Sequence, residues 1–164
     1  TYQATVTGRH FLKITSYRGS GAYTLDVTYG GSGGGGGGGT NPRPTKPGNL
    51  QVWITGNAAD SGKNPVNGPA LLLMGGGSEV DSAFANRAFP VANGGDVVVI
   101  RTTGSSGYND YLYNLATGAT KPDSVETMLL DTRDEANSDY AYWVLSNAEL
   151  IFIAGGDQSD YLNQ

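Results

Sequence analysis

Residues 30–39 are glycine throughout except for Ser32. A segment with almost no side chains has nothing to bury, so it cannot contribute to a core. As a random coil it spans roughly 17 Å root-mean-square. Residues 40–48 then add Pro42, Pro44 and Pro47, which stiffen and extend the chain. Residues 30–48 are therefore predicted to be a linker, and the 164 residues to contain parts of two domains.

The residues before this linker have the pattern of a β-hairpin. In residues 22–29 aromatic and aliphatic side chains alternate with polar ones, which is the period of a half-buried strand. Residues 10–15 repeat the pattern more briefly, and residues 16–21 supply turn residues between the two. So little apolar surface cannot form a stable sandwich alone. We therefore expect residues 1–29 to be antiparallel β structure from the end of a larger β domain.

Strand and helix patterns alternate after the linker. The patterns predict strands at 50–55, 70–74, 96–101, 125–130 and 149–154. They predict helices at 79–91 with Ser78 as N-cap, at 109–117, at 135–148 and from 157 onward. Strands separated by helices predict an α/β fold, a parallel sheet flanked by helices on both faces. We expect the unbroken apolar runs to be strands buried on both faces. An open sheet that stops at 149–154 would leave an apolar edge, so we expect an incomplete domain.

Composition excludes several classes of function. The chain has no cysteine and one histidine, His10, which excludes disulfides, cysteine-based zinc sites and His-rich metal sites. Residues 1–48 carry a net charge of +4 and residues 49–164 a net charge of −9. The acidic part would repel nucleic acid and anionic membranes, so neither is an expected partner. The sequence contains no transmembrane stretch and no visible signal peptide.

Ligands of open parallel sheets bind beyond the carboxyl ends of the strands. The predicted loops at these ends are 75–78, 102–107, 131–134 and 155–158. Two of them are glycine-rich, and their free backbone N–H groups could face an anion or an oxyanion. The alternative interpretation is that glycine only permits a tight turn. The last loop also holds Asp157 and Gln158, whose carboxylate and amide could hold a polar substrate.

Other chemistry is poorly supported. At the 75–78 loop, Val80 replaces the third glycine of a dinucleotide motif, and two acids lie where phosphate should bind. Ser32 matches a nucleophile elbow but lacks the flanking strand and helix. Asp131, Asp134 and Glu135, like Asp157 and Asp160, lack calcium-loop spacing and are more often helix caps. No metal site and no cofactor is predicted.

Three segments resemble cyanophycinase-like serine peptidases, relatives of peptidase E and of class I glutamine amidotransferases. They are Gly68–Gly77, Asp96–Thr103 and, most specifically, Ile151–Gln158, which ends in Gly-Gly-Asp-Gln. The resemblance covers about residues 49–164. It implies the N-terminal half of a flavodoxin-like or amidotransferase-like α/β domain.

This resemblance also implies a mechanism of which the chain holds a part. The family nucleophile is a serine at a strand-to-helix turn, with a histidine and an acid after it, and it would lie beyond Gln164. Gly155 and Gly156 would contribute the oxyanion hole, and Asp157 and Gln158 would line the substrate pocket. Ser78 and Ser105 are weaker pocket candidates, which helix capping would explain equally well. The implied substrate is a peptide or isopeptide, and the arginine-decorated polymer cyanophycin is one candidate.

A second resemblance covers residues 1–29, through Phe11–Tyr29. It is to the closing hairpin of bacterial pre-peptidase C-terminal domains, small β-sandwiches found beside secreted hydrolases. It implies a secreted or periplasmic protein. The expected function is therefore a serine-type hydrolase completed by the remainder of the same polypeptide. The alternative is a non-catalytic extracellular binding or assembly module on the same fold, and self-association into a homo-oligomer stays open.

Overall fold

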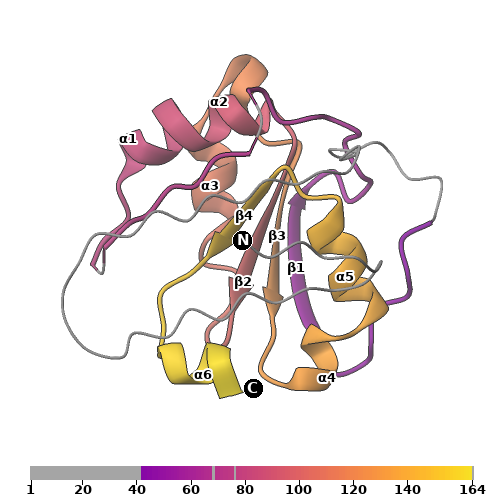
Figure 1. The fold of residues 1–164 in the computed structure, drawn as a ribbon. Helices are drawn as coiled ribbons and strands as arrows, with labels where there is room; N and C mark the ends of the chain where they lie inside the picture. Colours follow the sequence, from indigo (N-terminus) through magenta and orange to yellow (C-terminus); the bar gives the residue numbers. More distant parts are fainter. Residues whose placement is uncertain (1–41, 68, 76, 164) are drawn as a thin grey trace, which may run out of the picture. The chain divides into compact units, whose positions relative to one another are not determined.

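The computed structural model describes residues 42–67, 69–75 and 77–163, which form a mixed α/β fold around one four-stranded sheet (Figure 1). The strands are β1 (Gln51–Gly56), β2 (Asp96–Arg101), β3 (Ser124–Leu129) and β4 (Leu150–Ile153). The helices are α1 (Asp81–Ala83), α2 (Phe89–Ala92), α3 (Asn109–Leu115), α4 (Arg133–Ala136), α5 (Asp139–Ser146) and α6 (Gln158–Asn163), with a π-helical turn at Phe84–Ala88 and a 3₁₀ turn at Gly118–Thr120. The predicted hairpin in residues 1–29 lies outside the described residues.

The sheet has the strand order β1-β3-β2-β4 and is mostly parallel. β2 runs parallel to both β3 and β4, as predicted. β1 runs antiparallel to β3, with Gln51 opposite Leu129, so the prediction of a wholly parallel sheet is wrong for this strand. Helical crossovers set the direction of consecutive strands. β1 pairs with β3, and these two strands are not consecutive because β2 lies between them in the chain. The crossover rule therefore does not determine the direction of β1.

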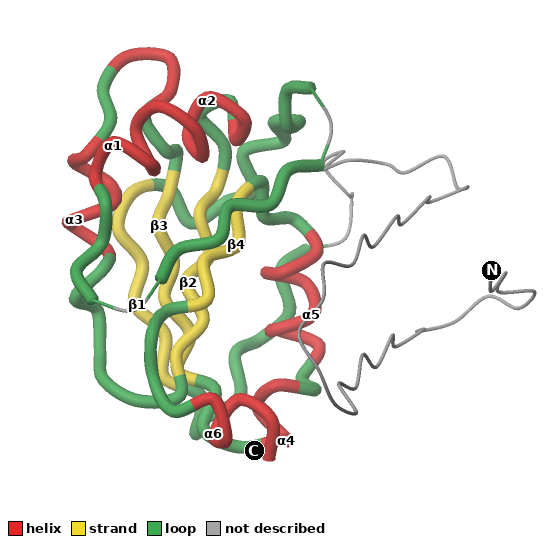
Figure 2. Tube along the Cα trace, turned by 60° about the vertical axis from the view of Figure 1, so that its left-hand side comes forward, coloured by secondary structure: helices red, strands yellow, loops and turns green. Residues whose placement is uncertain are grey.

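Helices cover both faces of the sheet, as the apolar pattern predicts (Figures 1 and 2). On one face Val97 and Val99 pack in a core with Phe84 and Phe89, beneath the α1-to-α2 helix and α3. On the other face Val98 packs in a second core that α5 covers. Successive side chains of a strand point to opposite faces, so β2 needs apolar residues at every position between two helical layers. The predicted burial of β2 and β3 on both faces is confirmed.

The predicted strand at 70–74 is absent from the sheet. Residues 69–75 have no regular secondary structure, and Leu71 and Leu73 are each 82% exposed. The physical reason lies in the pairing of β2. Its two edges bond to β3 and β4, so no inner position of the sheet is open to the run, and the run does not pair with the outer edge of β1 or of β4. The prediction of a strand buried on both faces is therefore wrong at these residues.

Local capping explains where the helices depart from prediction. The predicted helix 135–148 is two helices, because Thr132 and Glu135 form a capping box for α4 and Ser138 caps α5 by accepting from the amide of Ala141. The prediction of Ser78 as an N-cap is wrong. The helix begins two residues later than predicted, at Asp81, with Val80 as N-cap and without a side-chain cap.

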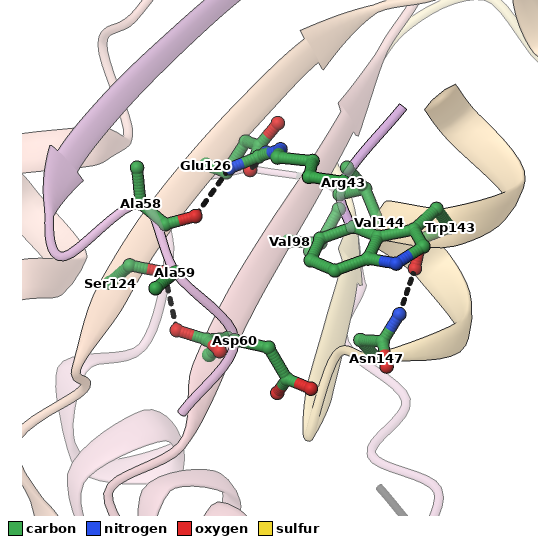
Figure 3. A pocket seen from close by; sticks show the side chains of 11 residues that line it. Arg43, Ala58, Ala59, Asp60, Val98, Ser124, Glu126, Trp143, Val144 and Asn147 are labelled. Carbon is green, nitrogen blue, oxygen red and sulfur yellow. Dashed lines mark hydrogen bonds and ion pairs between the residues drawn. The ribbon is translucent and has the colours of Figure 1, made fainter. Parts of the chain in front are cut away.

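A buried ion pair joins the stretch before β1 to the centre of the sheet. Arg43 pairs with Glu126 of β3, whose side chain is only 6% exposed, and donates to the carbonyl of Ala58 (Figure 3). The guanidinium lies 5.0 Å from the ring centroid of Tyr140, and the Tyr140 hydroxyl donates to Glu126 at 2.9 Å. Arg43 comes from the predicted linker 30–48, so residues at the end of that stretch pack on the α/β fold.

Two buried carboxyl groups meet at the amino end of β2. Glu149 Oε2 accepts from the amide of Asp96 at 2.6 Å, and Ser61 donates its amide to Asp96 and its hydroxyl to Glu149. Gly95 permits this approach, because a Cβ there would lie 2.3 Å from Glu149 Oε2. Burial is the largest cause that raises the pKa of Asp96 and of Glu149 above their ordinary values.

Replacing Arg43 by alanine is expected to lower the free energy of unfolding by about 3 kcal/mol, because it leaves the Glu126 carboxylate buried without its cation. Urea unfolding measures this loss. Adding Glu126→Gln to Arg43→Ala should recover part of it, since the buried charge is then gone. Arg87→Ala, at an exposed position, is the matched control. Equal stability of Arg43→Ala and Arg87→Ala would contradict the role of the ion pair.

Stability is expected to depend on pH through Asp96 and Glu149. Their folded-state pKa values lie above the ordinary 3.8 and 4.5, so the stability that the neutral carboxyls contribute is fully present below those values. It is lost as the pH rises through the folded-state pKa. Glu149→Gln should therefore gain stability relative to the unchanged chain as the pH rises above 4.5, the ordinary pKa of this carboxyl. Urea unfolding across this range measures the difference, and a constant difference would exclude the mechanism.

Candidate functional site

The carboxyl ends of β2, β3 and β4 lie at one edge of the sheet, as their parallel pairing requires. Ligand sites of open α/β sheets occur at this edge. Residues 102–108 lead from β2 to α3, and residues 154–157 lead from β4 to α6. The predicted loops after β2 and β4 therefore lie at the expected edge, whereas the glycine-rich loop predicted at 75–78 follows no strand of the sheet, because residues 70–74 lie outside it.

A pocket of about 300 Å³ opens to solvent beside the first turn of α3. It is lined by Glu79, Arg101, Gly107, Tyr108 and Tyr111. Arg101 is the last residue of β2, and the two tyrosines lie three positions apart at the start of α3, so they project from neighbouring positions of one helical surface. The pocket thus joins the end of a central strand, the start of a helix and the segment that precedes α1.

The two tyrosines hold two carboxylates in place. The Tyr108 hydroxyl donates to Glu79, and the Tyr111 hydroxyl donates to Asp81 at 2.6 Å. Burial and the bond to Glu79 raise the pKa of Tyr108 to about 12, and burial and the bond to Asp81 raise the pKa of Tyr111 to about 12. Both phenols therefore stay neutral donors at physiological pH. In the part of the chain that the structure describes, no lysine or arginine forms an ion pair with Glu79 or Asp81.

Arg101 is fixed by the loop that follows it. Its Nε donates to the carbonyl of Thr103 at 2.9 Å, and its Nη1 donates to the carbonyl of Ser105 at 3.0 Å. The guanidinium also lies 5.1 Å from the ring centroid of Tyr108. Gly104 has a φ of +96°, and a Cβ there would lie 2.3 Å from Arg101 Nη2. Glycine at this position therefore allows the loop to close around the guanidinium.

The predicted oxyanion-hole residues, Gly155 and Gly156, are exposed at the end of β4. A Cβ at Gly155 would meet nothing within 4 Å, so the space in front of this turn is open. The Tyr161 hydroxyl lies 2.8 Å from the carbonyl oxygen of Ala154 and 3.2 Å from that of Ile100. This hydroxyl holds the ends of β4 and β2 together behind the turn.

The predicted pocket residues after this turn lie at the start of α6. Asp157 Oδ1 accepts from the amide of Ser159 at 2.8 Å and from its hydroxyl at 2.7 Å. These bonds hold the pKa of Asp157 below its ordinary value. The carboxylate thus caps the helix, which is the structural interpretation of an acid at that position. Gln158 is the first residue of α6 and is exposed.

The two predicted serines are exposed and lie outside the lining of the pocket. Ser78 immediately precedes Glu79, and Ser105 lies in the loop that surrounds Arg101. Ser105 contributes its carbonyl oxygen to that arginine, so its structural role comes from the backbone. Ser78 is beside the pocket by chain position and does not cap the helix.

Sequence reasoning missed the tyrosines of the pocket. Tyr108 and Tyr111 flank the start of a predicted helix at the carboxyl end of a predicted strand, and their three-residue spacing was the available signal. Their pairing with Glu79 and Asp81 needed tertiary structure, because some 30 residues separate the partners. Tyr108 also packs edge-on against Phe152 of β4, with ring centroids 5.1 Å apart, which connects the pocket to the strand that leads to Gly155.

A second cavity, next to Arg43, is partly enclosed and has room for about one water molecule (Figure 3). Across residues 42–67, 69–75 and 77–163, no three acidic, histidine or cysteine side chains are grouped so as to hold a metal ion. No helix in these ranges has the length and apolar character needed to cross a membrane.

Comparisons with known proteins identify no relative. Neither a scan against protein-family models nor searches of curated proteins and of solved structures found a match to this chain.

Gly104→Ala is expected to destabilise the fold by two separable effects. The strain of a side chain at positive φ costs about 1–2 kcal/mol, and the clash with the Arg101 guanidinium adds about 1–3 kcal/mol. In an Arg101→Ala background only the first effect should remain. A double-mutant cycle measured by urea unfolding separates the two. Additive effects of the two substitutions would show that Gly104 does not hold Arg101 in place.

Proposed function

We propose that residues 49–164 form the substrate-binding half of a secreted serine-type hydrolase that resembles cyanophycinase. In this proposal the fold is a flavodoxin-like or amidotransferase-like half domain, and residues 1–29 end a pre-peptidase C-terminal domain. The pocket beside α3 receives a cationic side chain, such as arginine, of a peptide or isopeptide substrate. The observation that carries the proposal is Glu79, the carboxylate that lines the pocket and accepts from the Tyr108 hydroxyl. Neither Glu79 nor the nearby Asp81, which accepts from the Tyr111 hydroxyl, has a lysine or arginine ion-pair partner among the described residues.

The chemistry of these groups suits a guanidinium. A carboxylate accepts two parallel hydrogen bonds from a guanidinium fork, and the face of a tyrosine ring attracts a cation. Arg101 already lies over the ring of Tyr108, so the ring that the pocket offers to a ligand cation is that of Tyr111. The hydroxyl bonds from Tyr108 and Tyr111 fix the carboxylates before a ligand arrives, which reduces the ordering cost of binding. The net charge of −9 in residues 49–164 adds long-range attraction for a cationic substrate.

The open turn at Gly155 and Gly156 supplies the second element of the proposal. Backbone N–H groups at such a turn can stabilise the oxyanion of acyl transfer when they point at the reacting carbonyl. The serine nucleophile, the histidine and the acid that acyl transfer requires would come from the remainder of the same polypeptide. The pocket and the turn both lie at the carboxyl edge of the sheet, as a substrate that spans them requires.

A non-catalytic binding module on the same fold is the second candidate. The observation that favours it is the chemistry of the described residues. They include no histidine, and Ser78 and Ser105 are exposed, without a hydrogen bond from either hydroxyl to a general base. Cation binding in the pocket is common to both candidates, and catalysis separates them.

The pocket is expected to bind β-aspartyl-arginine in preference to β-aspartyl-citrulline, the neutral isostere of that ligand. Titration of the ¹⁵N-labelled chain should shift the amide resonances of Glu79, Arg101, Tyr108 and Tyr111. Glu79→Gln should weaken binding of the arginine ligand by about tenfold or more, because a hydrogen bond to a charged group contributes about 1.5–3 kcal/mol.

Asp139→Asn is the matched control for this titration. It removes one negative charge from an exposed residue at the start of α5, on the other face of the sheet, and should leave the affinity almost unchanged. Equal affinity for the arginine and citrulline ligands, or equal effects of the two substitutions, would refute the cation pocket.

The nucleotide sequence after the codon of Gln164 separates hydrolase from binding module. An in-frame Gly-x-Ser-x-Gly followed by a histidine supports catalysis. A stop codon soon after Gln164 would leave only the binding module.

A further inference from the structure

The outer edge of β4 and the apolar run Ala70–Met74 each lack a partner strand. β4 is the last strand in the sheet order, and its only partner among the described strands is β2. The Ile151 and Ile153 side chains of β4 are 45% and 62% exposed. In the described part of the chain, no backbone hydrogen bond involves Ala70–Met74. An exposed apolar edge and an exposed apolar run are both unfavourable in water.

The two segments lie near each other and share a direction. Figures 1 and 2 both show residues 69–75 passing alongside β4, and both segments run toward the same edge of the sheet. Met74 and Phe152 pack against the same core cluster. The last residue of the run and a residue of β4 therefore contact the same apolar core.

The alternation of side chains also agrees. In β4, Leu150 and Phe152 are partly buried, while Ile151 and Ile153 are exposed. In the run, Leu72 is 41% exposed between Leu71 and Leu73, which are each 82% exposed, and Met74 is partly buried. This is the same period of two. If Met74 keeps the face of Phe152, Leu71 and Leu73 take the face of Ile151 and Ile153.

The chain on both sides of the run is tied to the same fold. Before it, the amide of Val66 donates to the carbonyl of Val91 at 2.8 Å. After it, Glu79 and Asp81 accept from the hydroxyls of Tyr108 and Tyr111. Two tethers give the run a high effective concentration at β4 of its own molecule, above what a second copy reaches in dilute solution.

We propose that Ala70–Met74, which is unpaired in this structure, moves onto the outer edge of β4 in solution and pairs with it in parallel as a fifth strand of the sheet. The run supplies five consecutive backbone N–H groups, since Pro69 lies outside it. Pairing satisfies alternate backbone groups of the run and the outward-facing groups of β4. It also brings Leu71 and Leu73 beside Ile151 and Ile153, so that the two exposed apolar surfaces cover each other.

Amide hydrogen exchange of the 164-residue chain, followed by NMR, tests this pairing. In a parallel edge strand only every second residue bonds to the neighbour. Either the amides of residues 71 and 73 or those of residues 70, 72 and 74 should therefore exchange at least about tenfold more slowly than unstructured peptide amides. Uniformly fast exchange of all five would refute the proposal.

Leu72→Pro and Leu73→Pro give a second, register-specific readout, with Leu72→Ala and Leu73→Ala as matched controls. Proline removes one N–H and is tolerated on an edge strand only where that group faces away from the neighbour. If residues 71 and 73 bond to β4, Leu73→Pro should abolish the protection of the remaining slow amide and Leu72→Pro should leave the protection unchanged. If residues 70, 72 and 74 bond to β4, the effects of the two prolines are reversed. Protection that survives both prolines would overturn the proposal.

The dependence of exchange on protein concentration distinguishes pairing of β4 with the run of its own chain from pairing with a second copy. Intramolecular pairing predicts the same exchange rates across a hundredfold dilution, with a monomer in sedimentation velocity. Protection that appears only at concentrations where the chain is a dimer would assign the edge of β4 to a second copy and overturn the proposal.

Discussion

The strand β2 is enclosed on every side, and this constraint organises the described structure. Its edges bond to β3 and β4, and its faces pack against the α1-to-α3 layer and against α5. Val97, Val98 and Val99 can be buried together only because both layers are present. The same enclosure leaves β2 without a free edge, which excludes Ala70–Met74 from the position beside it.

Polar groups gather where β2 leaves the apolar layers. At its amino end Asp96 and Glu149 meet around Ser61, and burial raises the pKa of both carboxyls. At its carboxyl end Arg101 is surrounded by carbonyl oxygens of the following loop and by the ring of Tyr108. The amino end of β2 thus holds two buried carboxyl groups. The other presents a fixed cation, two phenols and two carboxylates to solvent, which is why the proposed ligand site lies there.

The buried charge of Glu126 is neutralised by Arg43, a residue from outside the predicted α/β domain. Glu126 occupies a buried position of β3, where an apolar residue would otherwise be expected, and Arg43 supplies its counter-charge together with the hydroxyl of Tyr140. The proline-rich residues 40–48 were predicted to be part of a linker because they lack apolar side chains. A single arginine within it can still be held firmly by one buried carboxylate, and no sequence period reveals that pairing.

Local patterns determined the elements that depend on their own residues. The sequence predicted the bounds of β2, β3 and α3 to within two residues, because the valine run of β2, the β-forming residues of β3 and the helical spacing of α3 are local signals. It also placed the glycine-rich turn at Gly155 and Gly156 at the carboxyl edge of the sheet, but not the one at 75–78, whose predicted strand is absent. Tertiary structure alone decided the direction of β1, the exposure of Ala70–Met74 and the pairing of Tyr108 with Glu79 and of Tyr111 with Asp81. Each of these is a choice among partners distant in sequence, and burial, strand edges and charge make that choice only once the chain has folded.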